Sequence, residues 1–408
     1  MITPSNDTGT ERLAMHNMRI TAVEIVEVQG PLPDTGLSGW TSQVHAASIY
    51  EDPSERNHRR MSAVPTITAR YLRIGTSGDV EGFYGPIDLE TLTPILGQIA
   101  PRLIGRDPLA VTVLWDMLAR VDRHAAQGHY RMAVSAVDNA LWDLRGRVFG
   151  APVWQLLGGS LRDSIPAYAS MLGTSLELDI VKERVVWAKS EGFSGQKWFL
   201  GDGPATGESG LRRNVEIART VRDAIGEYDE MMFDVFRGWN LAYAKAWTKR
   251  VEELVPTWLE EPFLPMQLAA YAELHRYTSV PLAMGEHFYD RSAFVPYLDR
   301  GILAVAQADP EWCGGVTELV RIGAMAELSS VPLIAHGHNI HAALHVAASQ
   351  SPLLCPKVEY LVNVVDIRHH FEVDPPRAVG GRISLPTRPG FGIMLDDVKV
   401  EKRSIRTS

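Results

Sequence analysis

From Ile165 to about residue 371 the chain repeats one pattern of hydrophobic and polar positions. A short apolar segment is followed by a turn and then by an amphipathic stretch. The apolar segments have the length of buried strands, and the stretches between them have the period of helices. Strands are expected at 167–170, 195–199, 231–235, 258–261, 282–286, 304–309, 332–336 and 358–362, with helices such as 176–192, 210–225 and 241–254 between them.

Parallel strands joined by crossover helices close into a barrel at eight strands. The pattern therefore predicts an α/β fold with a (β/α)8 barrel over residues 161–371. The alternative is an open doubly wound sheet. That fold would carry a glycine-rich phosphate turn after its first strand, and no such turn follows residues 167–170.

The first part of the chain has a different pattern. Strands are expected at 19–28 and 66–74, and helices at 89–105, 108–123 and 132–150. We therefore predict an N-terminal α+β capping domain over residues 19–160, preceded by a flexible leader at 1–18. Residues 29–63 are rich in Gly and Pro and lack periodicity, which is typical of a functional lid loop. The Pro/Gly-rich segment 372–408 is expected to return to the capping domain.

Composition narrows the class of protein. A length of 408 residues favours two domains, and 45% hydrophobic with 22% charged residues is ordinary for a soluble globular protein. The net charge of -9 gives no basic surface for nucleic acid. The two cysteines cannot form a disulfide framework, which favours a reducing compartment. No apolar run of about 18 residues or signal-peptide core occurs, so we expect a cytoplasmic protein without a membrane partner.

Three expected strands end in a carboxylate at equal spacing. Asp234, Glu260 and Glu286 are each separated from the next by 26 residues, one strand-plus-helix unit. In a barrel these ends meet at one mouth, where enzymes of this architecture keep their chemistry. A single acid at a strand end is usually a turn or helix cap, but three together suit Mg²⁺, which prefers oxygen ligands. Spacing alone does not choose between Glu260 and its neighbour Glu261.

Other strands bring further polar groups to the same mouth. Asp309 ends the sixth strand and His336 the seventh, so the carboxylate can lie within hydrogen-bonding reach of the imidazole and raise its basicity. Lys197 belongs to the second strand and Glu359 to the eighth. A metal, an oriented His and a Lys suit proton abstraction next to a carboxylate, because the cations stabilise the developing enediolate.

Five segments carry a resemblance to a known family. They are AVSAVDNALWDLRGRVFGAPVWQLLGG, WLEEP, GEH, QADPEWCGG and PGFGIML. Through them the chain resembles the mandelate racemase subgroup of the enolase superfamily, from about residue 19 to 396. Within the subgroup, KWFLGDGP with GLRRNVE, GEH, WCGG and AHG is most similar to the rhamnonate dehydratase family.

The resemblance implies a role for each matching residue. Those matching Asp234, Glu260 and Glu286 bind Mg²⁺ in that family. The residue matching His336 accepts the proton, and the one matching Asp309 raises its basicity. The match to Glu359 stabilises the transition state. A small-molecule acid sugar is then the expected substrate, and a homo-oligomer between dimer and octamer the expected assembly.

One position departs from the racemases of the subgroup, which carry Lys-x-Lys on the second strand. Here the pair is Lys197 and Phe199. Residues two apart on a strand face the same side, so Phe199 takes the place of the second base. A single His can remove the α-proton and then protonate the leaving β-hydroxyl on the same face. We therefore predict a hydro-lyase that converts an aldonate or aldarate to a 2-keto-3-deoxy acid.

Alternatives remain at the level of residues and of function. His287, beside Glu286, is a candidate substrate contact, as are His45 and Arg60 in the lid loop, although Arg60 can equally belong to a solvated face. His338, His341 and His345 have helix-start spacing, which favours packing roles. The functional alternatives are a racemase, epimerase or cycloisomerase on the same scaffold, and a non-catalytic acid-binding relative.

Overall fold

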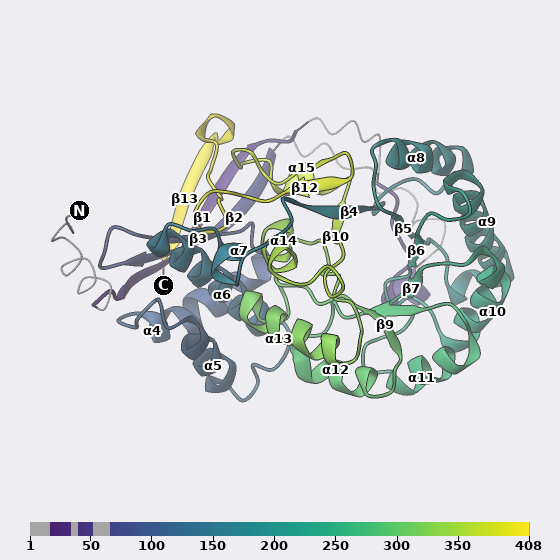
Figure 1. Ribbon diagram of the computed structural model, residues 1–408, viewed down its shortest axis with the longest axis horizontal. Coiled ribbons are helices and arrows are strands. Elements are labelled where there is room, and N and C mark those ends of the chain that lie inside the picture. Colours follow the sequence, from purple (N-terminus) through teal and green to yellow (C-terminus); the bar gives the residue numbers. More distant parts are fainter. Residues whose placement is uncertain (1–16, 34–39, 52–65, 408) are drawn as a thin grey trace, which may run out of the picture.

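The computed structural model describes residues 17–33, 40–51 and 66–407. Most of the expected leader and much of the lid loop, with Arg60, lie outside these ranges. Within them, a four-stranded antiparallel sheet lies beside a ring of mainly parallel strands (Figure 1). None of the described helices combines the length and apolar composition that a membrane crossing requires.

The antiparallel sheet joins the two ends of the chain. Its order is β13-β1-β2-β3, with β1 at Ile20–Pro31, β2 at Thr66–Thr76, β3 at Gly82–Tyr84 and β13 at Lys402–Thr407. Strand β13 pairs with β1 from Glu24 opposite Thr407 to Gln29 opposite Lys402. The C-terminal segment is thus part of the N-terminal sheet.

Helices cover this sheet. They are η2 (Leu89–Thr91), α3 (Leu92–Pro94), η3 (Ile95–Ile99), α4 (Ala100–Leu103), α5 (Val111–Val121), α6 (His129–Phe149) and α7 (Val153–Leu156); η1 (Ala46–Tyr50) lies apart from them in the chain. The single helix expected at 89–105 is divided into short pieces. Pro94 and Pro101 lie in this stretch and lack the amide hydrogen that a continuous helix needs.

The second sheet follows the predicted alternation of strand and helix. Its parallel strands are β4 (Ser164–Ser170), β5 (Gln196–Phe199), β6 (Met231–Asp234), β7 (Trp258–Glu260), β8 (Leu282–Met284), β9 (Leu303–Ala306) and β10 (Val358–Leu361). Strand β4 pairs with both β5 and β10, so the first and last strands are neighbours. This closure and the alternation confirm the barrel-type α/β fold.

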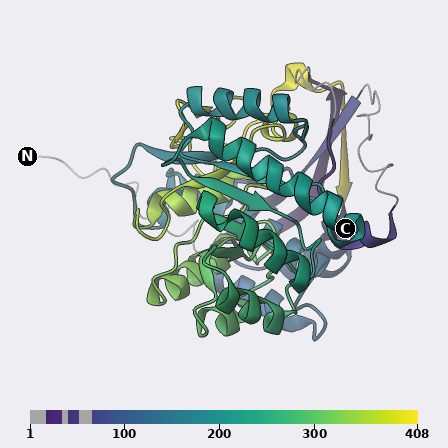
Figure 2. The same ribbon diagram turned by 90° about the vertical axis from the view of Figure 1, so that its right-hand side faces the viewer.

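Helices lie on the outside of this ring (Figure 2). They are α8 (Leu178–Ser190), α9 (Gly207–Ile225), α10 (Leu241–Val251), α11 (Leu268–Tyr277), α12 (Arg291–Leu298), α13 (Gly315–Leu328), α14 (Ile340–Ser349) and the short α15 (Val365–Arg368), with η4 (Pro204–Thr206) and η5 (Glu252–Leu254) between them. The C-terminal segment adds β11 (Ala378–Val379), β12 (Arg382–Ser384) and η6 (Asp397–Lys399), and β12 pairs antiparallel with β4.

The expected strand at 332–336 is only an isolated bridge between Leu333 and Ala306. Its Ile334 amide donates to Ala306, but its Leu333 amide donates to Leu354, ahead of β10, and no ladder to β10 forms. The prediction of a regular seventh strand is therefore wrong in detail. The segment still occupies its position in the ring, because Ile334 joins the buried interior cluster to which β4, β6, β7, β8 and β9 each contribute one side chain.

Helix α6 connects the sheet to the barrel and to the tail. Its Asp143 is fully buried and accepts hydrogen bonds from the Phe83 amide at 2.8 Å, the Phe391 amide at 2.8 Å and the Arg147 guanidinium at 2.6 Å. Gly390, at φ +71°, passes so close that a Cβ there would lie 2.1 Å from the Asp143 carboxylate. A single side chain thus holds three segments distant in sequence.

Replacing Asp143 tests this connection. Asp143→Ala leaves the Phe83 and Phe391 amides and the half-buried Arg147 guanidinium without their shared acceptor, so we expect the free energy of unfolding to fall by about 3 kcal/mol in urea titrations. The matched control is Asp116→Ala, which removes an exposed pair with Arg120 and should cost less than about 0.5 kcal/mol. Equal effects of the two substitutions would contradict the assignment.

Candidate active site at the barrel mouth

Three buried carboxylates lie at the carboxyl ends of neighbouring strands. Asp234 ends β6 and Glu260 ends β7, where the two are register partners, and Glu286 follows β8 by two residues. Their side chains are at most 5% exposed. The fold therefore places the three acids of the sequence pattern at one mouth, as parallel strands require.

Lys197 lies among these acids. From β5, its ammonium is 2.6 Å from Glu260 Oε1, 2.9 Å from Glu359 Oε1 on β10 and 3.4 Å from Asp234 Oδ2. Burial alone would lower the pKa of Lys197, but Glu260 and Glu359 outweigh it and raise the pKa well above its ordinary value. Lys197 is therefore a permanent positive charge inside the barrel.

Phe199 shares the side of β5 that carries Lys197. The Lys197 ammonium is 5.3 Å from the centroid of the Phe199 ring, within the range of a cation–π contact. The aromatic ring is 7% exposed and offers no proton. Lys197 is thus the one basic side chain of this strand at the mouth.

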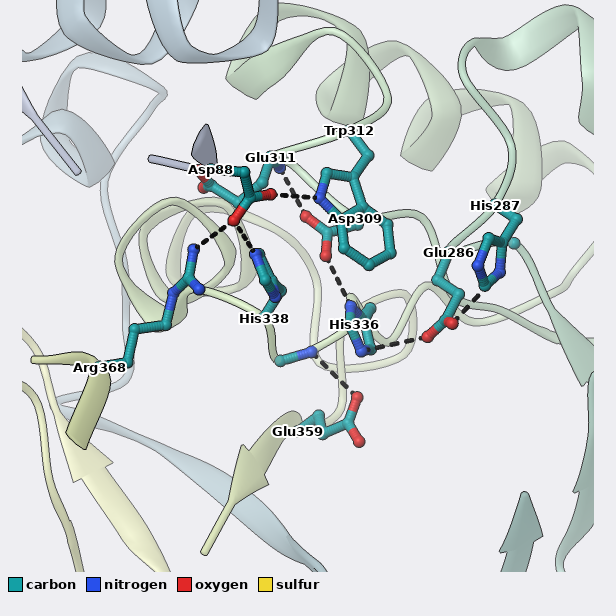
Figure 3. A network of polar contacts seen from close by, with 12 residues as sticks. Asp88, Glu286, His287, Asp309, Glu311, Trp312, His336, His338, Glu359 and Arg368 are labelled. Carbon is teal, nitrogen blue, oxygen red and sulfur yellow. Dashed lines mark hydrogen bonds and ion pairs between the residues drawn. The ribbon is translucent and has the colours of Figure 1, made fainter. Parts of the chain in front are cut away.

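His336 lies between two carboxylates (Figure 3). Its Nδ1 is 2.6 Å from Asp309 Oδ2, and its Nε2 is 3.1 Å from Glu286 Oε2. Burial alone would lower the pKa of His336, but Glu286 and then Asp309 raise it to about 10. With Asp309 accepting a hydrogen bond from Nδ1, Nε2 is the nitrogen that faces the mouth.

Glu359 contacts both the lysine and the histidine segment. Its Oε2 accepts a hydrogen bond from the Gly337 amide at 2.9 Å, and its Oε1 faces Lys197. Burial alone would raise the pKa of Glu359, but Lys197 and His336 lower it to about 2. Glu359 is therefore ionised and fixed beside His336.

His287 and Glu261 form a second pair next to Glu286. His287 Nδ1 is 2.7 Å from Glu261 Oε2 and 3.2 Å from Glu286 Oε1. The structure thus brings His287 to the mouth. It also separates the two adjacent glutamates, since Glu260 faces Lys197 while Glu261, at φ +38°, faces His287. In the sequence, only the position of Glu261 directly after Glu260 indicated that a second acid lies at the end of β7.

A network that the sequence did not predict covers His336 (Figure 3). The Trp312 ring lies 5.2 Å from His336, 4.9 Å from His338 and 5.8 Å from His287, measured between centroids. Asp88, from the segment after β3, accepts hydrogen bonds from Trp312 Nε1 at 3.1 Å, from Arg368 and from His338 Nε2 at 2.8 Å. No sequence pattern pairs Asp88 with residues more than 200 positions later.

Of the two expected lid residues, one is described. The Val44 amide donates to the carbonyl of Leu200, the residue directly after β5, which places His45 near the mouth. The His45 side chain itself lies 3.1 Å from Glu51, and no described contact joins it to the barrel acids. Arg60 lies outside the described residues.

The acids of the mouth offer oxygen donors of the type that a divalent cation binds, but Asp234, Glu260 and Glu286 do not together form one of the described groups whose ligand atoms lie within 4.8 Å of one another. Burial raises the pKa of Asp234 to about 6 and that of Glu260 to about 8, and it raises the pKa of Glu286. Each of the three also raises the pKa of another through charge repulsion. Asp234 and Glu260 turn towards Lys197, whereas Glu286 turns towards the two histidines. Crowded oxygen donors of this kind suit Mg²⁺.

Comparison with known proteins gives two family matches. Residues 12–158 match the family described as mandelate racemase/muconate lactonizing enzyme, N-terminal domain, and residues 180–399 match the family described as enolase C-terminal domain-like. Together they span most of the chain.

Individual relatives are similar over nearly their whole length. The chain is 34% identical to the L-rhamnonate dehydratase of Saccharopolyspora erythraea over 392 residues, which cover 93% of this chain and 97% of the relative. The crystal structure of L-rhamnonate dehydratase from Gibberella zeae has a TM-score of 0.78 at 25% identity, with 93% of this chain and 94% of that chain covered. The 3,6-anhydro-D-galactonate cycloisomerase of Zobellia galactanivorans has a TM-score of 0.75 at 25% identity, with 94% and 100% covered.

The charge of Lys197 can be tested without any activity assay. In EDTA, Lys197→Met leaves Glu260, Glu359 and Asp234 without their shared cation, so we expect a loss of about 3–5 kcal/mol in the free energy of unfolding at pH 8. Lys189→Met removes an exposed pair with Asp229 and serves as control, with an expected loss of at most about 1 kcal/mol. A Lys197 variant as stable as the control would show that the ammonium does not hold these carboxylates.

Proposed function

The chain belongs to the mandelate racemase/muconate lactonizing enzyme family of the enolase superfamily, and we propose that it is a Mg²⁺-dependent dehydratase of a sugar acid. The substrate class is an aldonate similar to rhamnonate, or an aldarate, and the product is a 2-keto-3-deoxy acid. The similarity to L-rhamnonate dehydratase over almost the whole chain supports this reaction class. The single observation that carries the proposal is the His336–Asp309 pair at the mouth. On β5, which carries Lys197, the position that could hold a second base is occupied by Phe199.

In this proposal Asp234, Glu260 and Glu286 hold the Mg²⁺. Bound there, the ion supplies positive charge that stabilises the carboxylate of the substrate as its α-carbon is deprotonated. The Lys197 ammonium adds a second positive charge beside the same acids. Trp258 and Gln307 fix Glu260, because both donate to its Oε2, at 3.0 and 2.6 Å.

His336 acts as base and then as acid. Neutral Nε2 takes the proton from the α-carbon, and the electrons of that C–H bond move into the carboxylate to give an enediolate. The enediolate electrons then form the α,β double bond as the β-carbon–oxygen bond breaks. The same Nε2–H protonates the departing hydroxyl, so water leaves and the enol tautomerises to the 2-keto acid. Asp309 holds the ring throughout.

The geometry favours elimination over inversion at the α-carbon. Inversion by two bases needs a second basic group on the face opposite His336. The strand position that would supply it is Phe199, and Lys197 is engaged by three carboxylates. A base and an acid on one face are sufficient for loss of water.

A second candidate function is an isomerase on the same scaffold. It is favoured by the similarity to the cycloisomerase from Zobellia galactanivorans. Incubation of aldonic and aldaric acids in D₂O, followed by NMR, separates the two. The dehydratase yields a 2-keto acid with at most one deuterium at C3, whereas an epimer or α-exchange without keto acid would favour the isomerase.

The proposed metal ligands can be tested one at a time. Asp234→Asn, Glu260→Gln and Glu286→Gln each remove one of three anionic ligands, so we expect the Kd for Mg²⁺ to rise by about 100-fold or more in calorimetric titrations. Glu261→Gln is the matched control, because its carboxylate faces His287 instead, and its Kd should change by less than about tenfold. Binding at the wild-type level in any of the three would remove that residue from the site.

The roles of His336 and Asp309 lead to a separate prediction. His336→Asn should abolish dehydration and α-proton exchange together, with Mg²⁺ binding retained. Asp309→Asn should lower kcat by about 10²–10⁴-fold with little change in KM, since the imidazole loses the anion that orients it. Phe199→Leu is the control and should keep turnover. Exchange at the wild-type rate in His336→Asn would show that another group is the base.

A further inference from the structure

A second cluster of metal-binding side chains lies away from the barrel mouth. It consists of His341 on α14, His369 directly after α15, and Glu372, and one ligand atom from each lies within 4.8 Å of the other two. All three side chains are at most 2% exposed. The other described group with this geometry is Glu261, Glu286 and His287, which belongs to the mouth.

Glu372 is the centre of the cluster. Its Oε2 lies 2.7 Å from His341 Nε2, and its Oε1 lies 2.9 Å from His369 Nδ1. The hydroxyl of Tyr71, on β2, is 3.4 Å from the same Oε1. The cluster therefore lies where the N-terminal sheet, the barrel helix α14 and the C-terminal segment meet.

The side chains of the cluster are of the types that bind a divalent transition metal. Imidazole nitrogens and a carboxylate coordinate such an ion, and binding releases any proton that they carry. One ligand atom from each residue is already within 4.8 Å of the other two.

There is also room for a further ligand. A cavity of about 320 Å³ is lined by His341 and Glu372, together with Arg377, Arg388, Ser384 and Phe391. His341 Nδ1 and His345 Nε2, one helical turn apart on α14, are buried without a hydrogen-bond partner among the described residues. The cluster thus lies next to unpartnered buried nitrogens and a cavity with polar walls, although its own ligand atoms are hydrogen-bonded to one another.

We propose that His341, His369 and Glu372 bind a Zn²⁺ ion, with a fourth position open to the cavity for water or a small anion. Two nitrogens and one carboxylate suit Zn²⁺, whereas Mg²⁺ prefers oxygen ligands alone. Zinc–ligand bonds of about 2.0–2.2 Å require the donor atoms to move apart by roughly half an ångström from their present hydrogen-bonded distances. The site is independent of the dehydratase proposal, because it shares no residue with the mouth.

The test uses the full chain, stripped with EDTA and kept in millimolar Mg²⁺ to occupy oxygen-only sites. ZnCl₂ is titrated by calorimetry, and bound zinc is counted after dialysis. We expect one zinc per chain with a Kd of about 1 μM or tighter, and a Tm higher by several degrees with zinc than without. Absence of zinc binding under these conditions would overturn the proposal and leave Glu372 as a hydrogen-bonded structural acid only.

Variants locate the ion. His369→Gln and Glu372→Gln should each weaken zinc binding by at least about 100-fold. His370→Gln is the matched control, because His370 is next to His369 in the sequence but is not part of the cluster. This variant should bind zinc as the wild type does. Zinc binding at the wild-type level in His369→Gln, or its loss in the control alone, would also overturn the assignment.

Two further measurements distinguish zinc bound at the cluster from misfolded variants and from zinc bound at the barrel mouth. If the ligand variants fail to fold, the visible spectrum of wild-type protein loaded with Co²⁺ decides. Strong bands of a four- or five-coordinate site support the cluster, and weak bands of a six-coordinate oxygen site alone contradict it. Glu286→Gln, which disables the proposed Mg²⁺ site, should keep the zinc. Loss of zinc in that variant would place the ion at the mouth instead, and lack of dehydratase activity has no bearing on the outcome.

Discussion

The balance of buried charge inside the barrel is the constraint on which the mouth depends. Asp234, Glu260 and Glu359 are removed from water, where isolated carboxylates are costly. The Lys197 ammonium lies within 3.4 Å of all three. This cation lowers the pKa of each of the three acids, against the rise that burial causes. In the proposed function the same ammonium also supplies positive charge for a carboxylate substrate.

One carboxylate of the N-terminal part of the chain joins the network that covers His336. Asp88 follows β3 and joins Trp312, His338 and Arg368, which come from three later segments (Figure 3). Burial alone would raise the pKa of Asp88, but His338 and Arg368 lower it below its ordinary range, so the carboxylate stays ionised. Because the Trp312 ring packs against His336, Asp88 connects the antiparallel sheet to the catalytic histidine of the proposed mechanism.

Local periodicity was sufficient to predict the barrel and the order of its strands, but the expected strands 282–286 and 304–309 end early, at Met284 in β8 and at Ala306 in β9. Equal spacing of Asp234, Glu260 and Glu286 follows from a repeated strand-plus-helix unit, and such a unit is visible in the sequence. The segment 332–336 could not be recognised as irregular, because its partners on the side of β10 depend on where Leu354 and Glu359 lie. Asp88 and Glu372 were missed for a similar reason. Their partners belong to elements far apart in the chain, and these elements come together only in the folded structure. No local sequence pattern indicates such contacts.

The charge on His336 connects the fold to the proposed chemistry. Glu286, beside Nε2, is the largest of the groups that raise the pKa of His336 to about 10, so the ring holds a proton at neutral pH. An imidazole must be neutral to act as a base, so the charge of Glu286 must no longer raise the pKa of His336. Neutralising the charge of Glu286 removes the largest of the interactions that raise this pKa. Asp309 and Glu359 still raise it, and the burial of the ring lowers it. The two assignments of the proposed mechanism therefore depend on each other: a cation bound at Glu286 lowers the pKa of His336, and this allows His336 to act as the base.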